Sequence, residues 1–240
     1  MIRANCRIQF TRADVDFLFT HASKATRTRI GARSDLNIHK LDWLLDDEQV
    51  FRRAYDARDF ARFSPHFFFY VGTRWCLRFY GLYAYDLADY VASVLCDCIK
   101  TVNLYRTAMN GERLVYLVDM VEELNETASK EDQFDHHAHI GNYTLFLSGL
   151  FPDYFEYLSS YKRRLITSRY YEKMGQTHYS QASVHQIARK EQLDGVLSDL
   201  AHQFPTVRRA LTKLSVEYLD FNRSNAQRTY LSIMNEMDEG

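Results

Sequence analysis

The residues best suited to chemistry in this chain are an acidic run and the histidines that follow it. Residues 119–135 carry seven Asp and Glu side chains against one lysine, and His136, His137 and His139 come directly afterwards. If this segment is helical, Asp132, His136 and His139 lie on one face, because side chains three and four residues apart are neighbours on a helix. Carboxylates and imidazoles brought together in this way are suitable ligands for iron or manganese.

Further carboxylates and histidines could complete such a site. Glu122 and Glu126 share a face of the preceding helical segment, and His178 and His185 share a face of a later one. Two helical turns separate the later histidines by roughly 10 Å, so they cannot bind the same ion, but either can complete a site formed elsewhere. Helical bundles build two-metal sites from such side chains on facing helices. The candidate ligands are Glu122, Glu126, Asp132, His136, His139, His178 and His185.

The same residues also have a purely structural interpretation. The Glu-x-x-His motif of ferritin-like bundles occurs nowhere in the sequence. Carboxylates in the first turn of a helix stabilise it through the helix dipole, with no metal involved. A metal-dependent oxidoreductase of the diiron or dimanganese type, with iron or manganese as cofactor, is therefore an alternative hypothesis. If that hypothesis does not hold, the sequence predicts no cofactor.

A second group of candidates is basic and aromatic. Residues 161–173 contain five basic side chains, one glutamate and three tyrosines, and residues 23–34, which we expect to form an exposed loop, carry four basic side chains without a carboxylate. Arginines that bind phosphates beside rings that stack on bases are typical of single-strand nucleic-acid binding. Alternatively, positive charge in the last turn of a helix only stabilises the helix dipole. The candidates in the first stretch are Lys162, Arg163, Arg164 and Arg169.

Arg74 and Arg78 form a third candidate, because they stand four residues apart in an otherwise apolar segment. A buried guanidinium is tolerated when it is paired with a carboxylate, and Asp86, Asp89 and Asp119 are the expected partners. Such a pair of arginines could bind an anionic ligand. A structural ion pair, or a side chain whose charged end reaches the surface, is the more common arrangement.

Apolar residues recur with helical spacing almost everywhere, and no window alternates as a strand would. The sequence predicts an all-α fold, a single compact array of about ten helices around two strongly apolar central helices at about 65–80 and 132–151. The three prolines, at positions 65, 152 and 205, are each expected to begin a helix. The other expected helices are 11–21, 38–45, 47–63, 86–110, 112–124, 152–165, 168–189, 193–204, 205–221 and 222–237.

One domain is expected to cover 1–240, with a more polar N-terminal appendage over 1–63 as the alternative. Nine glycines, three prolines and 15% aromatic residues argue against collagen-like, low-complexity and turn-rich β chains. Thirty basic against 31 acidic side chains create no overall attraction to nucleic acid or anionic lipid. We find neither a secretion signal nor a membrane-spanning stretch, and we therefore expect a cytoplasmic protein.

No nucleophile elbow, glycine-rich phosphate loop or His-Glu-x-x-His helix identifies a reaction. The leading hypothesis is a non-enzymatic helical protein that acts by association, as a homo-oligomer or with a partner protein. Acidic and basic segments within a neutral total favour complementary docking, and the aromatic surplus suits interface anchors. We therefore expect some Tyr or Phe side chains to cluster on the surface.

Overall fold

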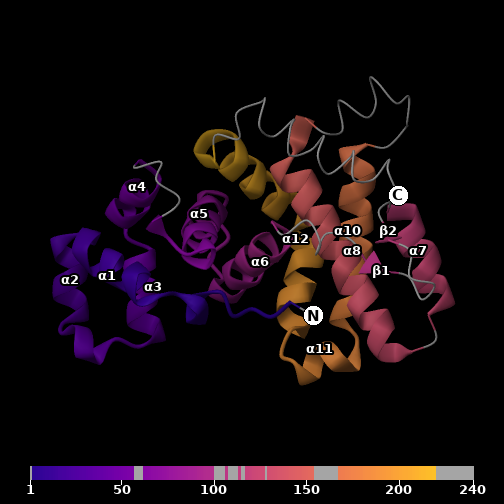
Figure 1. Cartoon of the computed structure of the whole chain (residues 1–240), viewed down its shortest axis with the longest axis horizontal. Coiled ribbons are helices and arrows are strands. Elements are labelled where there is room, and N and C mark those ends of the chain that lie inside the picture. The colour runs from indigo at the N-terminus through magenta and orange to yellow at the C-terminus, as the bar shows by residue number, and fades with distance from the viewer. Residues whose placement is uncertain are drawn as a thin grey trace. The chain divides into compact units, whose positions relative to one another are not determined.

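A computed structural model of the chain describes residues 2–56, 62–99, 106–107, 113–114, 117–127, 129–153 and 167–219. Within these residues every regular element is a helix, except two short strands that pair antiparallel, β1 (Arg106–Thr107) and β2 (Arg113–Leu114) (Figure 1). The prediction of an all-α fold is confirmed. No helix in the described ranges combines the length and the apolar character needed to cross a membrane.

The chain divides into two compact units. The N-terminal unit comprises Arg3–Cys96, and the C-terminal unit comprises Asp97–Gly240 together with the first two residues. The boundary between them falls inside helix α6 (Tyr85–Cys98) rather than in a linker. The predicted single domain and the alternative appendage over 1–63 both stay predictions.

The N-terminal unit contains one long apolar helix, α5 (Pro65–Phe79), which buries ten of its fifteen residues. It begins as predicted, because the Ser64 side chain accepts a hydrogen bond from the Phe67 N–H and Pro65 occupies the first position. The buried carboxylate of Asp14 accepts hydrogen bonds from the backbone N–H and the hydroxyl of Ser64, which ties the first α-helix to the start of α5. The other elements are η1 (Arg7–Gln9), α1 (Arg12–His21), α2 (Lys24–Ile30), η2 (Arg33–Asp35), α3 (Ile38–Leu45) and α4 (Glu48–Asp56).

The expected loop over residues 23–34 is wrong, because α2 and η2 occupy it. Ser23 begins α2 by accepting a hydrogen bond from the Thr26 N–H, and the apolar side chain of Ile30 is buried. A capping residue and one buried anchor are sufficient to order a short basic helix. The predicted exposure is nevertheless correct. The exposed basic side chains are Lys24, Arg27, Arg29 and Arg33.

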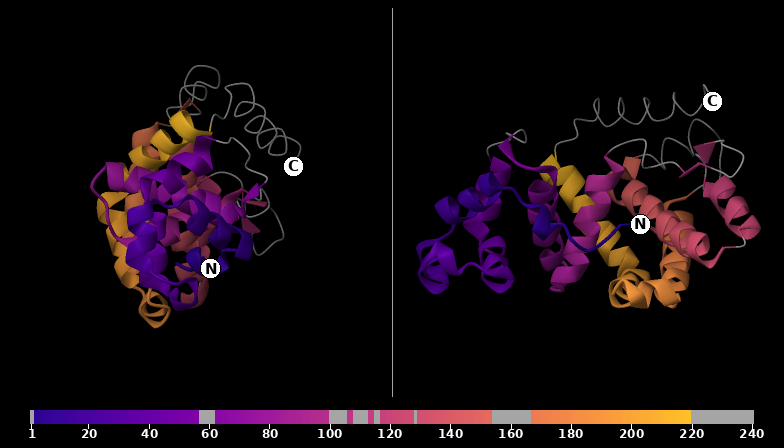
Figure 2. Two further views of the ribbon diagram at one scale, coloured as in Figure 1. Left: turned by 90° about the vertical axis from the view of Figure 1, so that its left-hand side faces the viewer. Right: turned by 60° about the horizontal axis from the view of Figure 1, so that its bottom comes forward.

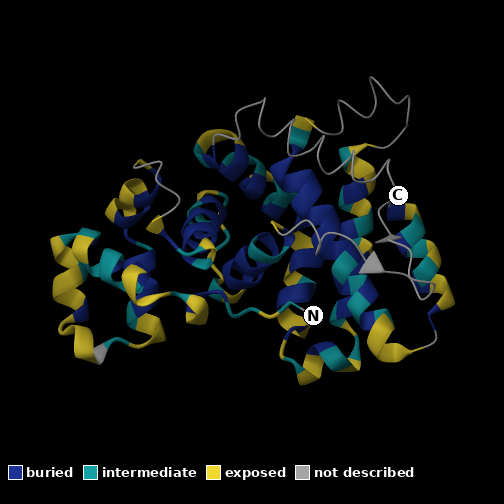
Figure 3. Cartoon of the chain, in the orientation of Figure 1, coloured by how far each residue is buried: buried dark blue, intermediate teal, exposed yellow. Residues whose placement is uncertain are grey.

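The C-terminal unit is organised around α8 (Lys130–Leu150), which buries 14 of its 21 residues and agrees with the predicted central helix (Figure 3). It packs against α10 (Ser168–Ser183) and α12 (Asp194–Lys213), which also lie side by side (Figures 1 and 2). The remaining elements are α7 (Leu117–Glu126), α11 (Gln186–Lys190) and η5 (Leu214–Leu219), a π-helical segment.

Glycines allow these helices to approach closely. A Cβ atom on Gly141 would lie 2.7 Å from the ring of Tyr179, and one on Gly175 would lie 2.1 Å from the ring of Phe204. The Tyr179 hydroxyl donates a hydrogen bond to Asn142 Oδ1 at 2.8 Å. Aromatic rings on one helix therefore lie directly against the backbone of the next.

The expected helix start at Pro205 is wrong, because α12 runs through this proline. A proline inside a helix lacks the N–H that would bond the carbonyl four residues earlier, which is that of Ala201. Here Nε2 of Gln176, on α10, donates to the Ala201 carbonyl at 3.3 Å. The neighbouring helix supplies the donor that the proline lacks, and this is why α12 continues past Pro205.

Candidate functional site

Two histidines form a close contact between α8 and α10. The Nδ1 atoms of His137 and His178 lie 2.9 Å apart, and their ring centroids are separated by 5.0 Å. Burial, and then the charge of His137, lower the pKa of His178 to about 4. Burial, and then the charge of His185, lower the pKa of His137. The pair is therefore neutral at physiological pH, with one ring donating and the other accepting a hydrogen bond.

The structure places only one of the seven predicted metal ligands in this pair, namely His178. Its partner, His137, was not among the candidates. The expected shared helix face of His178 and His185 is wrong, because α10 ends at Ser183. His185 instead caps α11, where its Nδ1 accepts a hydrogen bond from the Ile187 N–H at 3.3 Å.

Gly141 marks the face of α8 that carries His137, but only the structure shows that this face meets α10. Gly141, one turn later on α8, lies against Tyr179, which follows His178 directly on α10. Positions four residues apart share a helix face, so His137 belongs with Gly141. The predicted stripe through His136 and His139 lies on other faces of α8. The His136 side chain is buried there, and the His139 side chain is half-buried.

The predicted carboxylate ligands do not join the histidine pair. Glu122 and Glu126 are exposed on α7, and Asp132 is exposed in the first turn of α8. In the part of the chain that the structure describes, no three His, Cys, Asp or Glu side chains are grouped so that they could hold a metal ion. The metal-dependent alternative stays a prediction.

The first part of the basic and aromatic stretch, residues 161–166 with Lys162, Arg163 and Arg164, lies outside the described residues. Arg169 is exposed in the first turn of α10, beside the exposed Tyr170. Nucleic-acid binding through residues 161–173 stays a prediction.

Arg74 and Arg78 both interact with Asp46, the residue that follows α3. Nε of Arg74 donates to Oδ1 of Asp46 at 2.8 Å, and Nη1 of Arg78 lies 3.3 Å from the same oxygen. The Tyr85 hydroxyl also donates to this carboxylate, at 2.9 Å. None of the three carboxylates expected from the sequence is the partner. The structural interpretation therefore fits Arg74, whose side chain is buried and fully engaged.

Arg7 forms a second buried ion cluster, which contains two of those expected carboxylates. Its Nη1 donates to Asp42 at 2.6 Å, its Nη2 to Asp86 at 3.2 Å, and its Nε lies 3.3 Å from Asp89. Burial raises the pKa of Asp42 and of Asp89, although Arg7 opposes the rise in both. The cluster holds η1 against α3 and α6.

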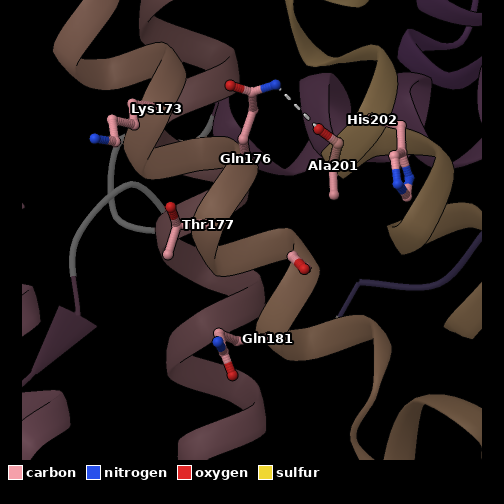
Figure 4. A pocket seen from close by; sticks show the side chains of 7 residues that line it. Lys173, Gln176, Thr177, Gln181, Ala201 and His202 are labelled. Carbon is pink, nitrogen blue, oxygen red and sulfur yellow. Dashed lines mark hydrogen bonds between the residues drawn. The ribbon is translucent and has the colours of Figure 1, made fainter.

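A shallow polar groove of about 450 Å³ lies between α10 and α12. Gln176 points across it to the Ala201 carbonyl (Figure 4). The lining residues are Lys173, Gln176, Thr177, Ser180, Gln181, Ala201 and His202. Their amides and hydroxyls can form hydrogen bonds with a ligand, but this mixture favours no particular class of ligand.

The turn between α5 and α6 exposes two large aromatic side chains. Phe79 and Tyr83 are each 65% exposed, and the ring of Phe79 contacts Tyr80 edge to face, with centroids 5.2 Å apart. We call residues Phe79–Tyr83 the aromatic turn. The expectation that aromatic side chains are exposed agrees with Phe79 and Tyr83, and their clustering on the surface stays a prediction.

The backbone of the aromatic turn is held in a Schellman motif. The Gly81 N–H donates to the Arg78 carbonyl and the Leu82 N–H donates to the Leu77 carbonyl, both at 3.0 Å. Gly81 has a φ of 81°, which a residue with a Cβ rarely adopts. Nη1 of Arg74 donates to the carbonyl oxygen of Tyr83 at 2.8 Å. The exposed rings therefore stand on a backbone that is fixed from both sides.

No family model, curated protein or solved structure matches the chain. Function has to be inferred from its own side chains.

Proposed function

We propose that the protein acts by association with a second copy of itself, and that the aromatic turn is the contact surface. The observation that carries this proposal is the exposure of Phe79 and Tyr83 on an ordered backbone. Exposed aromatic side chains of this size are enriched among the residues that dominate binding energy at protein interfaces.

The fixed geometry of the turn favours binding. Ordering a loop during association costs free energy, and an already ordered loop avoids most of that cost. The Schellman hydrogen bonds and the bond from Arg74 to the Tyr83 carbonyl order the aromatic turn before any partner arrives. The turn therefore resembles a preorganised anchor more than a flexible surface loop.

A second copy is the partner that the surrounding charges fit. Asp86, whose side chain is 82% exposed and pairs with Arg7, and Arg78, which is 32% exposed and pairs with Asp46, stand near the two ends of the aromatic turn. In a two-fold symmetric dimer both copies use the same patch, so an acidic side chain of one copy can meet a basic side chain of the other. A patch that carries an apolar centre and both signs of charge is self-complementary in this way.

Analytical ultracentrifugation over a range of concentrations tests the proposal. We expect a reversible monomer–dimer equilibrium, weakened more than tenfold in the Phe79→Ser/Tyr83→Ser double variant, because truncating an anchor typically costs more than about 1 kcal/mol. The matched control is Val184→Ser, since Val184 is also 65% exposed but belongs to the C-terminal unit. We expect the control to dimerise like the unmodified protein.

A monomeric mass at every concentration overturns the proposal, and so does a dimer that the double variant leaves unchanged. Circular dichroism of each variant checks that the helices remain formed. Equal weakening by Val184→Ser would mean that apolar exposure in general, rather than the aromatic turn, drives association.

A further inference from the structure

A basic surface in the N-terminal unit surrounds the imidazole of His21, at the end of α1. Arg53 on α4 and Arg62 just before α5 are exposed, and both act electrostatically on His21. Arg27 on α2 lies close to the same helix end, with its Nη1 3.5 Å from the Thr20 carbonyl. Lys24 begins α2, three residues after His21. We call this group the His21 surface, and its members are His21, Lys24, Arg27, Arg53 and Arg62.

The positive charge of this surface is only partly compensated. The structure records no ion pair for Lys24, Arg27 or Arg53 with any residue that it describes. The nearby Asp47 is buried and is occupied by hydrogen bonds from the N–H and hydroxyl of Ser23. The adjoining elements also carry the ion pairs Asp16–Arg33 and Glu48–Arg52, the exposed Asp56 at the end of α4, Arg12 on α1 and Arg29 on α2.

The whole N-terminal unit reinforces this local charge. Residues 3–96 contain 14 Lys and Arg side chains against 11 Asp and Glu. Among the residues of the unit whose burial the structure describes, four carboxylates are buried and two arginines are, Arg7 and Arg74. The surface of the unit is therefore more positive than its sequence composition suggests. The buried carboxylates are those of Asp14, Asp42, Asp47 and Asp89.

We propose that the His21 surface binds the phosphate backbone of a nucleic acid. Three of its four cations are arginines, and a guanidinium donates two parallel hydrogen bonds to one phosphate group.

The pKa of His21, at the centre of the surface, should report the binding of a phosphate. Its ring lies 4.4 Å from that of Phe17, one turn earlier on α1. Burial, and then the positive charges of Arg53 and Arg62, lower the pKa of His21. A bound phosphate would offset those charges and raise this pKa. Binding should therefore take up a proton and become tighter as the pH falls through the ordinary pKa of histidine.

Fluorescence anisotropy with a labelled oligothymidylate measures the binding directly. We expect the logarithm of the association constant to fall with the logarithm of the salt concentration with a slope of about −2, as expected on a single strand for Lys24, Arg27 and Arg53. The Arg27→Gln/Arg53→Gln variant should lower the slope to about −0.7 and weaken binding at least tenfold at low salt. The matched control is Arg189→Gln/Lys190→Gln, which removes two exposed cations of α11 in the C-terminal unit. It should leave both quantities unchanged.

The NMR titration of His21 gives an independent readout, because its pKa should rise when the oligonucleotide is added. The proposal is overturned if no binding occurs at low salt, or if the α11 control weakens binding as much as the Arg27/Arg53 variant. It is also overturned if the pKa of His21 does not move, or if polyglutamate binds as tightly as the oligonucleotide, which would indicate an acidic protein partner. Ultracentrifugation of the Arg27/Arg53 variant should show unchanged self-association, because this surface is separate from the aromatic turn.

Discussion

The two units of the chain stabilise their interiors in different ways. The N-terminal unit buries ionised groups, with Arg7 and Arg74 each held by carboxylates from other elements. The C-terminal unit joins its helices through neutral contacts, such as the His137–His178 pair and the Tyr179–Asn142 hydrogen bond. Buried ion pairs are costly to break, whereas neutral helix packing depends on shape and on protonation state. The units should therefore respond differently to mutation and to acid.

The largest effect should come from removing a carboxylate from the ion clusters. Asp46→Ala leaves the buried guanidinium of Arg74 without its ion pair, and we expect a loss of about 3 kcal/mol, near the lower limit for a buried pair because Asp46 is partly exposed. Urea unfolding followed by tryptophan fluorescence measures it, since Trp43 and Trp75 both belong to the N-terminal unit.

The matched control is an ion pair of the C-terminal unit. Glu172→Ala breaks the contact with Arg208, in which both side chains are 23% exposed. We expect a cost below about 1 kcal/mol, measured by circular dichroism in urea, because water already screens this pair. A cost as large as that of Asp46→Ala would remove the distinction between the units.

Lowering the pH should change the folding stability of the two units in opposite directions. The pKa of His178 is lowered from 6.5 to about 4 in the folded protein, so the unfolded chain binds the proton more readily. The neutral His178 side chain makes its full contribution to folding stability above pH 6.5. This contribution, up to about 3 kcal/mol, is lost as the pH falls towards 4. In the N-terminal unit the raised pKa values of Asp42 and Asp89 act in the opposite direction, because protonation favours the folded state just above pH 3.8.

Amide hydrogen exchange at several pH values resolves the two responses. Protection of α8 and α10 should decrease between pH 6.5 and 4, while protection of α5 in the N-terminal unit should be kept or increase. His178→Gln should reduce the dependence in α8 and α10. If α8 and α10 keep full protection down to pH 4, the neutral histidine pair does not stabilise this packing.

A smaller effect tests the close packing of the C-terminal unit. Gly175→Ala places a Cβ atom 2.1 Å from the Phe204 ring, and we expect a loss of about 2 kcal/mol because a packed core tolerates added volume poorly. The control is Gly195→Ala, where nothing lies within 4 Å of the new atom. It should leave stability unchanged or raise it by up to about 1 kcal/mol. Thermal unfolding followed by circular dichroism compares the two, and equal behaviour would contradict the close approach.

The sequence predicted best those elements whose boundaries depend on local signals. A capping box of Thr11 and Asp14 begins the helix predicted over 11–21, and Pro65 begins α5 as expected, with Ser64 as its cap. These signals act between residues that are close in sequence, so they can be read without knowledge of packing. The central helices were also predicted, because a segment with almost no polar face has to be surrounded by other helices.

The errors arose where a distant residue decides the local structure. Pro205 does not begin a helix, because Gln176 on another helix bonds the carbonyl that the proline leaves open. The partner of Arg74 is Asp46, 28 residues away, and no periodicity connects them. Likewise, His137 meets His178 only because glycines determine which face of α8 lies against α10. Spacing along one helix says which side chains are neighbours, but not which neighbouring helix they meet.

The position of the unit boundary inside α6 has a consequence for proteases. Proteases need an extended stretch of backbone in the active-site cleft, and domain junctions are commonly cut because they are exposed linkers. Here the chain passes from one unit to the other at Cys96 and Asp97 within a continuous helix, whose backbone is already hydrogen-bonded. Limited digestion should therefore not cut the chain at this junction. The two units should still be covalently joined there after the first cleavages have occurred elsewhere in the chain.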